Sequence, residues 1–314
     1  MKNVLVTGGL GFIGSHVVDL LLEQDYNVTA VDNLDTGKQA NLQHLKPYEN
    51  SRLKIYKFEF DDFGILSNIR DGKYDYVLHL AAKASVPYSV DNPMLSNDVN
   101  VSKTLALLDA CRSGKVKKFV FSSSSAVYGD SDMFPTKESC SKNPLSPYAL
   151  QKSVIEDYCK MFYNLYGVES VCLRYFNVFG PRQAGSGPYA NVISSWCENG
   201  IKHKKIRLDG KGESSRDFVY VKDVAKANLL AMTSHMKHAC INIGGGNSIP
   251  IKDVLLTFEE CFDVQVTNAP ARLGDPLRTL ADVSLAKTLL GFEPTKVTPD
   301  LFRETFVWYK ENVK

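Results

Sequence analysis

The stretch Thr7-Gly8-Gly9-Leu10-Gly11-Phe12-Ile13-Gly14 decides how this chain begins to fold. It follows the short apolar run Asn3–Thr7 and leads into the segment Ile13–Gln24, whose apolar residues recur at helical spacing. Gly8, Gly11 and Gly14, spaced three residues apart, let the backbone approach a phosphate group closely. The free N–H groups at the start of a helix attract the negative charge of that phosphate. The pattern therefore predicts a strand, a tight turn and a helix that together bind a nucleotide.

An acidic residue at the end of the next β-rich run supports this interpretation. Asn27–Asp32 reads as the second strand, and Asp32 lies about twenty residues after the glycine turn. A carboxylate at this place accepts hydrogen bonds from ribose hydroxyls and repels a 2′-phosphate. We therefore expect the cofactor to be NAD rather than NADP.

Short β-rich runs alternate with amphipathic helical segments through the first half of the chain. Because the runs are almost continuously apolar, they are typical of parallel strands covered by helices on both faces. The strand candidates are Asn3–Thr7, Asn27–Asp32, Leu53–Lys57, Tyr76–Leu80, Lys118–Ser122 and Ser170–Arg174. The predicted fold class is α/β, a Rossmann-type doubly wound parallel sheet.

After about residue 177 the regular alternation ends. A loop rich in glycine and proline spans residues 180–188, a second break lies at Gly244-Gly245-Gly246, and short helices are mixed with short strands between and beyond them. We interpret this half as a smaller α+β substrate-binding lobe. The expected division is an NAD-binding domain over residues 1–176 and a nucleotide-sugar-binding lobe over 177–314, with the chain free to cross back to the first domain.

Composition and charge exclude several other classes of protein. The 314 residues include 44% hydrophobic and 23% charged side chains, as in ordinary globular chains, so neither a disordered chain nor a disulfide scaffold is expected. The net charge of +2 gives no sign of nucleic-acid binding, and no apolar run is long enough for a signal peptide or a membrane span. Seven cysteines without a Cys-x-x-Cys pair favour free thiols over zinc or disulfides, and we expect a cytoplasmic enzyme without a metal.

Three side chains have the chemistry of a proton-transfer site. Tyr148 and Lys152 are four residues apart on a helix that begins near Ser146, so their side chains share one face. An ammonium group close to a phenol lowers its pKa, as a general base requires. Ser124 lies just past a strand end, where catalytic groups collect in this architecture, and its hydroxyl could bind a reacting sugar oxygen.

With these segments taken together, the whole chain resembles the extended short-chain dehydrogenase/reductase family, and within it the UDP-hexose 4-epimerases. The segments that carry the resemblance are Thr7–Gly14, Asp32-Asn33, His79–Ala82, Ser122–Gly129, Tyr148–Lys152, Leu173–Asn177, Arg216–Phe218 with Tyr220-Val221, and Gly274-Asp275.

The resemblance implies a set of cofactor and substrate contacts. For NAD they are Gly8, Gly11, Phe12, Ile13, Asp32, Asn33, Asp61, Asp62, Ala81, Lys83, Asn100, Tyr148, Lys152 and Phe176. For the UDP-sugar they are Ser124, Asn177, Asn191, Val192, Arg207, Arg216, Arg272, Asp275 and Thr279, the arginines suiting a diphosphate and Asp275 the ribose hydroxyls.

Two positions refine the expected reaction. Ala126 stands where the dehydratases and decarboxylases similar to this chain carry an acid, and epimerisation requires none there. Thr279 stands where enzymes restricted to glucose and galactose tend to have a tyrosine, so the resemblance implies room for an acetamido group on C2. The bacterial UDP-N-acetylglucosamine 4-epimerases look most similar. The alternative for Thr279 is simple packing in a turn.

The function predicted from the sequence is therefore an NAD-dependent UDP-sugar 4-epimerase that interconverts UDP-N-acetylglucosamine and UDP-N-acetylgalactosamine, with activity on the glucose pair left open. The alternatives are a 4-keto reductase, a dehydratase or a UDP-glucuronate epimerase of the same family, and a non-catalytic NAD-sensing regulator. Relatives in this family are commonly dimers, which implies a homodimer through the helices at Asn100–Arg112 and Val154–Tyr166.

Overall fold

The structure, a computed structural model, describes residues 1–49, 51–131, 133–185, 191–271 and 276–313. Within them, a parallel sheet of seven strands has the order β10-β6-β5-β4-β1-β2-β3. The strands are β1 (Asn3–Thr7), β2 (Asn27–Val31), β3 (Leu53–Tyr56), β4 (Tyr76–His79), β5 (Lys118–Ser124), β6 (Ser170–Tyr175) and β10 (His238–Ile243). The predicted doubly wound α/β fold is therefore confirmed.

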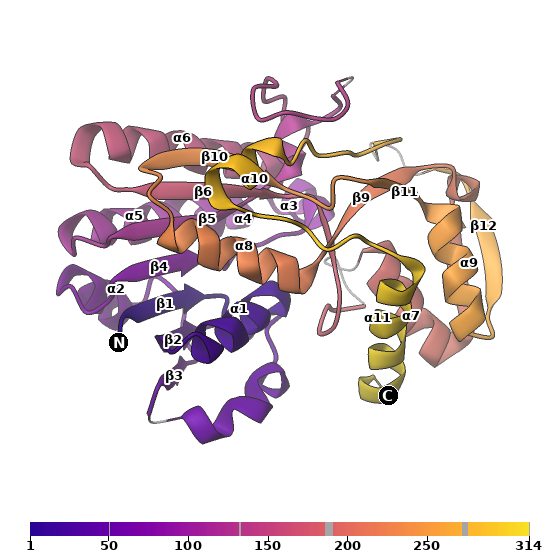
Figure 1. Cartoon of the computed structure of the whole chain (residues 1–314), viewed down its shortest axis with the longest axis horizontal. Coiled ribbons are helices and arrows are strands. Elements are labelled where there is room, and N and C mark those ends of the chain that lie inside the picture. Colours follow the sequence, from indigo (N-terminus) through magenta and orange to yellow (C-terminus); the bar gives the residue numbers. More distant parts are fainter. Residues whose placement is uncertain (50, 132, 186–190, 272–275, 314) are drawn as a thin grey trace.

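Helices cover both faces of this sheet (Figure 1). One face packs against α1 (Phe12–Glu23), α8 (Val221–Thr233) and α10 (Ser284–Leu290). The other packs against α2 (Phe63–Arg70), α5 (Thr104–Ser113) and α6 (Pro147–Tyr166). Since successive residues of a strand point to opposite faces, Val4 and Val6 enter the first core and Leu5 enters the second. This is why the strands read as continuous apolar runs.

The second lobe lies at the carboxyl end of the sheet, on the right in Figure 1. It holds the three-stranded sheet β11-β9-β7 and the pair β12-β8. Its elements are β7 (Asn177–Phe179), α7 (Val192–His203), β8 (Lys205–Asp209), β9 (Ser215–Tyr220), β11 (Ser248–Pro250), α9 (Ile251–Cys261), β12 (Gln265–Ala269) and α11 (Pro299–Asn312). Its core is rich in aromatic rings, with Phe179, Phe218 and Phe302 packed on one another.

The structure differs from the sequence-based expectation in one strand and one helix. The segment 238–243 is not among the strand candidates, because polar residues interrupt it, yet it forms the edge strand β10 beside β6. The chain thus crosses back to the large sheet after β9, through α8 and β10. The predicted helix Asn100–Arg112 begins as a wider π-helical turn, Asp98–Lys103, before α5.

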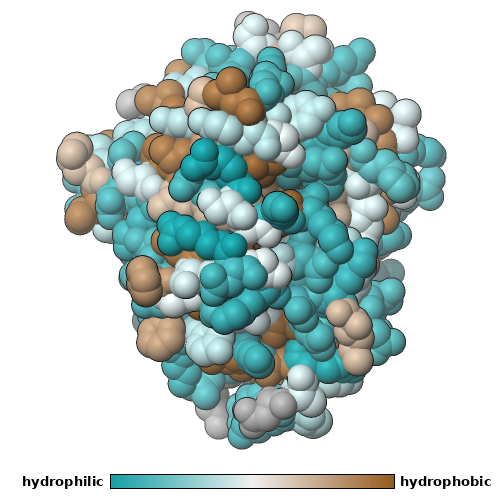
Figure 2. All heavy atoms as spheres, turned by 90° about the vertical axis from the view of Figure 1, so that its left-hand side faces the viewer, coloured by the Kyte–Doolittle hydropathy of each residue, from teal (hydrophilic) through white to brown (hydrophobic). Residues whose placement is uncertain are grey.

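The face at the amino ends of the strands is shown in Figure 2. Hydrophilic side chains cover most of it, and hydrophobic groups are scattered between them. Along the described ranges, each helix lacks the length or the apolar character that crossing a membrane would require.

We expect the substitution Gly14→Ala to destabilise the protein, although alanine is the better helix former. A Cβ at Gly14 would lie 2.0 Å from the carbonyl oxygen of Gly8, so α1 would have to move away from the turn. Such overpacking costs about 1–3 kcal/mol of unfolding free energy. Urea denaturation measures the change.

The matched control for this prediction is Gly167→Ala at the end of α6. Gly167 has φ +70°, but no atom lies within 4 Å of its added Cβ, so only the left-handed backbone is penalised, by about 1 kcal/mol. If Gly14→Ala is as stable as the wild type, the close approach of α1 to the glycine turn is not required for the fold.

Candidate active site

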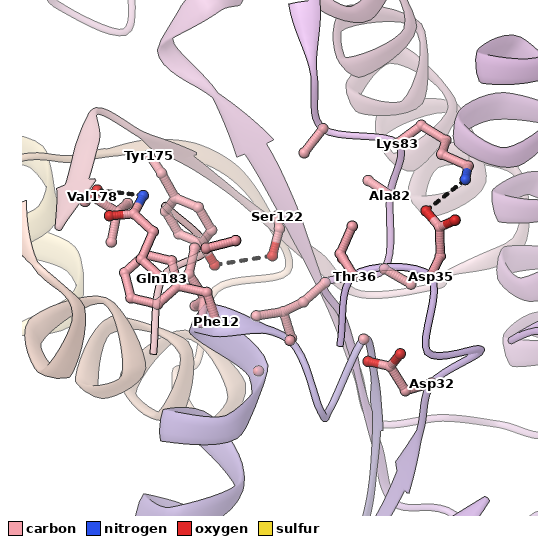
Figure 3. Close-up of a pocket in the computed structure, with 18 of the residues that line it drawn as sticks. Phe12, Asp32, Asp35, Thr36, Ala82, Lys83, Ser122, Tyr175, Val178 and Gln183 are labelled. Carbon is pink, nitrogen blue, oxygen red and sulfur yellow. Dashed lines mark hydrogen bonds and ion pairs between the residues drawn. The ribbon is translucent and has the colours of Figure 1, made fainter. Parts of the chain in front are cut away.

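A cavity of about 390 Å³ opens at the carboxyl ends of the central strands. The glycine turn after β1 forms its floor. The walls come from the carboxyl ends of β5 and β6, from residues that follow β2, β3, β4 and β6, and from α6. In Figure 3 the pair Lys83 and Asp35 stands on one side of the cavity, and Tyr175 and Gln183 stand on the other. Because parallel strands all end at this edge, residues far apart in the chain meet here.

The glycine turn brings backbone N–H groups to the cavity floor. Gly8 has φ +68°, and a Cβ on it would lie 2.8 Å from the nitrogen of Ala81, so this position requires glycine. Helix α1 begins at Phe12 without a side-chain cap, and Gly8, Gly11, Phe12 and Ile13 all line the cavity. The N–H groups of the first helical turn, which have no partner within a helix, therefore face a ligand.

Asp32 lies at the edge of the cavity and is 7% exposed. Its Oδ2 accepts a hydrogen bond from the Leu10 nitrogen (3.0 Å) and its Oδ1 one from the Leu34 nitrogen (2.8 Å). Burial raises the pKa of Asp32, and these N–H donors counteract the rise. Since a carboxylate offers about four acceptor sites, it retains capacity for ribose hydroxyls.

Tyr148, Ser124 and Lys152 come together where β5 ends and α6 begins. The Ser124 hydroxyl lies close enough to the Tyr148 phenol to lower the pKa of Tyr148. Lys152 lies one helical turn after Tyr148, with its Nζ 5.8 Å from the Tyr148 ring centroid, and it donates a hydrogen bond to the Ser122 carbonyl oxygen (2.7 Å). Both Tyr148 and Lys152 are buried and line the cavity.

The electrostatics of this group differ from the sequence-based expectation in one respect. Burial raises the pKa of Tyr148, and only the hydrogen bond from Ser124 lowers it. Burial also lowers the pKa of Lys152 to about 7. Desolvation therefore outweighs the stabilisation of the phenolate that the sequence-based expectation assigned to Lys152.

Lys83 is held over the cavity by two contacts. Its Nζ lies 2.7 Å from Oδ2 of Asp35 (Figure 3). Its backbone exchanges hydrogen bonds with the side chain of Asn100, whose amide also binds Gln151. Asn100, predicted to contact the cofactor, thus lies behind the cavity wall and supports it.

Two predicted cofactor residues lie away from the cavity. Asp62 caps the start of α2 by accepting from the Gly64 and Ile65 nitrogens, and Asp61 pairs with Lys103 (3.4 Å). The cavity is lined instead by Phe58, Glu59 and Phe60. The signal that could have found Glu59 is its place three residues after β3, close to the edge where the parallel strands end.

The predicted substrate residues are more dispersed. Asn177, Asn191 and the cofactor residue Phe176 line the cavity, while Val192 begins α7 and is not among the lining residues. Arg207 is exposed and pairs with Asp209 (2.5 Å). Arg216 lies on β9, and Thr279 lies behind Asn177, to which its hydroxyl is hydrogen-bonded (3.1 Å). Arg272 and Asp275 lie outside the described residues.

Other residues of the cavity wall were not singled out by the sequence. They include Asp35, Thr36, Tyr175, Arg182 and Gln183. Among the residues that the structure describes, no three His, Cys, Asp or Glu side chains form a cluster that could hold a metal ion.

Comparison with known proteins places this geometry in a family. The sequence model of the NAD dependent epimerase/dehydratase family matches residues 4–244. The chain belongs to this family.

Three solved structures resemble the chain over essentially its whole length. A UDP-N-acetylglucosamine 4-epimerase from Methanobrevibacter ruminantium M1, in complex with UDP-N-acetylmuramic acid, is 42% identical, with 99% of each chain covered and a TM-score of 0.93. A UDP-glucose 4-epimerase from Thermotoga maritima with UDP-glucose is 36% identical, with 100% of each chain covered and a TM-score of 0.92. A UDP-glucose 4-epimerase from Thermus thermophilus, in complex with NAD, is 34% identical over 99% of this chain and 100% of that one, with a TM-score of 0.89.

Membership of the family makes NAD the cofactor, and the cavity fits it. The glycines leave the space that a diphosphate needs, the uncapped start of α1 offers its N–H groups, and Asp32 keeps acceptor capacity for a ribose. The amide oxygen Oε1 of Gln183 is buried without a hydrogen-bond partner on the cavity wall, which suits a polar ligand.

The depressed pKa of Lys152 predicts a pH-dependent stability. The unfolded chain has a lysine pKa near 10.5, whereas the folded value is about 7. As the pH falls from about 10 to 7, the unfolded chain takes up a proton that the folded protein does not, so stability is lost over this range. We expect the unfolding free energy of the wild type, relative to Lys152→Met, to decrease over this range and to level off below pH 7.

Urea denaturation of both proteins from pH 6 to 10 measures this difference. Lys160→Met, at an exposed position of the same helix, is the control for removing a lysine. If the difference in unfolding free energy between the wild type and Lys152→Met stays constant with pH, the lowered pKa of Lys152 is contradicted.

Proposed function

We propose that this protein is an NAD-dependent UDP-sugar 4-epimerase, an isomerase, whose preferred pair is UDP-N-acetylglucosamine and UDP-N-acetylgalactosamine. The observation that carries this proposal is the group formed by Tyr148 and Lys152, which line the cavity, and Ser124, whose hydroxyl lies close enough to lower the Tyr148 pKa. The three similar structures are UDP-sugar 4-epimerases, which supports the reaction type.

The residues of the site divide the reaction between them. Bound NAD⁺ would supply the reversible hydride acceptor for C4 of the sugar. Tyr148 takes the proton of the 4-hydroxyl as general base, and Ser124 orients that oxygen through its own hydroxyl. The protonated form of Lys152, which a pKa of about 7 keeps populated at neutral pH, stabilises the phenolate form of Tyr148. The 4-keto sugar then turns about its diphosphate link, and its other face meets the cofactor.

The side chains after Ser124 favour epimerisation over elimination. They are Ser125 and Ala126, neither of which can protonate a leaving hydroxyl. A dehydratase needs a general acid at the reacting end of the site. The carboxylates that line the cavity, Asp32, Asp35 and Glu59, follow β2 and β3, away from the Tyr148–Ser124 pair on β5 and α6.

Two observations support the acetylated sugar. Thr279, one hydrogen bond behind Asn177 of the cavity wall, is much smaller than a tyrosine, and the family resemblance associates a small residue at this position with substrates that carry an acetamido group on C2. The M. ruminantium relative is a UDP-N-acetylglucosamine 4-epimerase and is 42% identical to this chain. The other two relatives are UDP-glucose 4-epimerases, so the glucose pair is the second candidate substrate.

We expect the NAD-loaded protein to convert UDP-N-acetylglucosamine to its 4-epimer faster than it converts UDP-glucose, and to leave UDP-glucuronate unchanged. Parallel NMR assays of the three substrates give the rates. Accumulation of a 4-keto product would identify a dehydratase, a demand for external reductant would identify a reductase, and absence of any 4-epimer would refute the proposal.

We expect Tyr148→Phe to reduce kcat by roughly 10²–10⁴-fold, because the ring remains while the proton acceptor is lost. The same NMR assay measures the rate. Tyr166→Phe, at the exposed end of the same helix, is the matched control and keeps wild-type activity. Full activity of Tyr148→Phe would remove the assigned base.

We also propose a homodimer through α6 and the neighbouring helices. Leu150, Met161 and Leu165 lie along one side of α6 and are 52%, 41% and 63% exposed. Met94 and Leu95 of α4 (Pro93–Asn97), which packs against α6, are exposed as well. Apolar side chains at such helical spacing suit a helix-to-helix contact between two copies.

Light scattering after size exclusion tests the dimer. We expect the wild type at twice the chain mass and Met161→Glu, which places a charge in the contact, at the mass of one chain with its fold retained by circular dichroism. Val307→Glu on α11, where the valine is also exposed, is the control and stays dimeric. A monomeric wild type would contradict the proposal.

A further inference from the structure

The hydroxyl of Thr279 lies between the backbone of β9 and the side chain of Asn177. Its Oγ1 accepts a hydrogen bond from the Asp217 nitrogen (2.8 Å) and donates one to Oδ1 of Asn177 (3.1 Å). Asn177 lines the cavity, whereas Thr279 is one hydrogen bond behind it. Thr279 therefore acts on the cavity indirectly, through the amide of Asn177.

This arrangement fixes which end of the amide faces the cavity. A hydroxyl has a single proton to donate, and the Asp217 N–H already points at its oxygen. If the amide were reversed, its NH₂ could donate to the second lone pair of the hydroxyl oxygen, but the hydroxyl proton would lose the acceptor that Oδ1 provides, which costs free energy in a partly buried place. Asn177 therefore turns Oδ1 to Thr279 and leaves its Nδ2 donors to the cavity. In the described part of the chain no acceptor engages Nδ2.

The position of Thr279 is itself fixed by buried hydrogen bonds. Its backbone nitrogen donates to the Ser215 carbonyl oxygen (3.1 Å). Two residues on, the Ala281 nitrogen donates to Oδ2 of Asp217 (2.8 Å), a carboxylate that is fully buried. The same carboxylate accepts from the nitrogens of Gly245 (2.6 Å) and Gly246 (3.2 Å). The backbone of the segment 279–281 is thus hydrogen-bonded to β9 at Thr279 and again at Ala281.

We propose that Thr279 is a positioning residue that holds the Asn177 amide with both N–H donors toward the nucleotide sugar. This inference rests on the proposed function, since it concerns the same substrate. A group that only donates recognises an oxygen that accepts, and a UDP-sugar offers such oxygens in its diphosphate, in the carbonyls of its uracil and, where present, in an acetamido carbonyl. The hydroxyl at position 279, and not only the small size of the side chain, then contributes to substrate binding.

The test compares two near-isosteric substitutions of Thr279. Thr279→Val keeps the shape and loses the hydroxyl, so the amide is free to reverse, while Thr279→Ser keeps the hydroxyl. Loss of one such hydrogen bond corresponds to about a 3- to 10-fold weaker Kd. We expect this loss in Thr279→Val, and near wild-type affinity in Thr279→Ser. Thr288→Val on the exposed side of α10 is the hydroxyl-deletion control.

Calorimetric titration of the NAD-loaded proteins with UDP, UDP-glucose and UDP-N-acetylglucosamine supplies the Kd values. A similar loss for all three ligands assigns the accepting oxygen to the UDP part that they share, and a loss confined to UDP-N-acetylglucosamine assigns it to the acetamido carbonyl. Either result supports the proposal. In steady-state assays Thr279→Val raises KM while kcat changes little, as expected for uniform binding.

Coupling between the two residues gives the decisive comparison. In an Asn177→Ala background, Thr279→Val adds no further loss, because the amide that it positions is absent. Additive losses, equal losses for the valine and serine variants, or wild-type binding by Thr279→Val would each overturn the proposal, as would failure of the wild type to bind any of the three ligands. A protein that binds UDP-sugars without epimerising them contradicts the proposed function alone, and the Kd comparison still decides the role of Thr279.

Discussion

The absence of side chains at Gly8 and Gly14 is the constraint on which the rest of the structure depends. An added Cβ would meet the backbone of Ala81 at the first position and the carbonyl of Gly8 at the second, so α1 could not begin where it does. The close turn sets α1 against β1 and leaves the first N–H groups of the helix facing the groove. This groove fits the family's cofactor, and Tyr148 and Lys152 of α6, the proposed reacting groups, line the same cavity.

The proposed reacting groups are positioned by helix α6, which carries two of them on one face. Ser146 caps its start, Pro147 occupies its first turn, and Tyr148 and Lys152 follow at a spacing of one turn. The Lys152 ammonium binds a carbonyl of β5, two residues before Ser124. One turn further, Glu156 accepts from Ser123 and forms a buried ion pair with Arg174 of β6. The register between α6 and these strands is therefore fixed by buried polar contacts, which require defined directions.

The sequence is most informative where a local rule applies. The glycine turn, Asp32, the Tyr148–Lys152 spacing and six strands are all predictable, because each depends on neighbouring residues. Asp61 and Asp62 lie outside the cavity wall, since the number of residues between a strand end and a groove is set by the loop path. The role of Thr279 depends on a contact across 102 residues, which no local pattern encodes. The division at residue 176 stays a prediction.

The return of the chain to the large sheet affects how the protein is synthesised. Strand β6 lies between β5 and β10, and β10 is formed only by residues 238–243. While the ribosome makes the lobe, β6 is an edge strand with unpaired backbone groups and an apolar sequence, which invites pairing with other chains. The nascent protein thus carries an aggregation-prone edge throughout the synthesis of the lobe elements β7 to β9 and of α8, until β10 covers it.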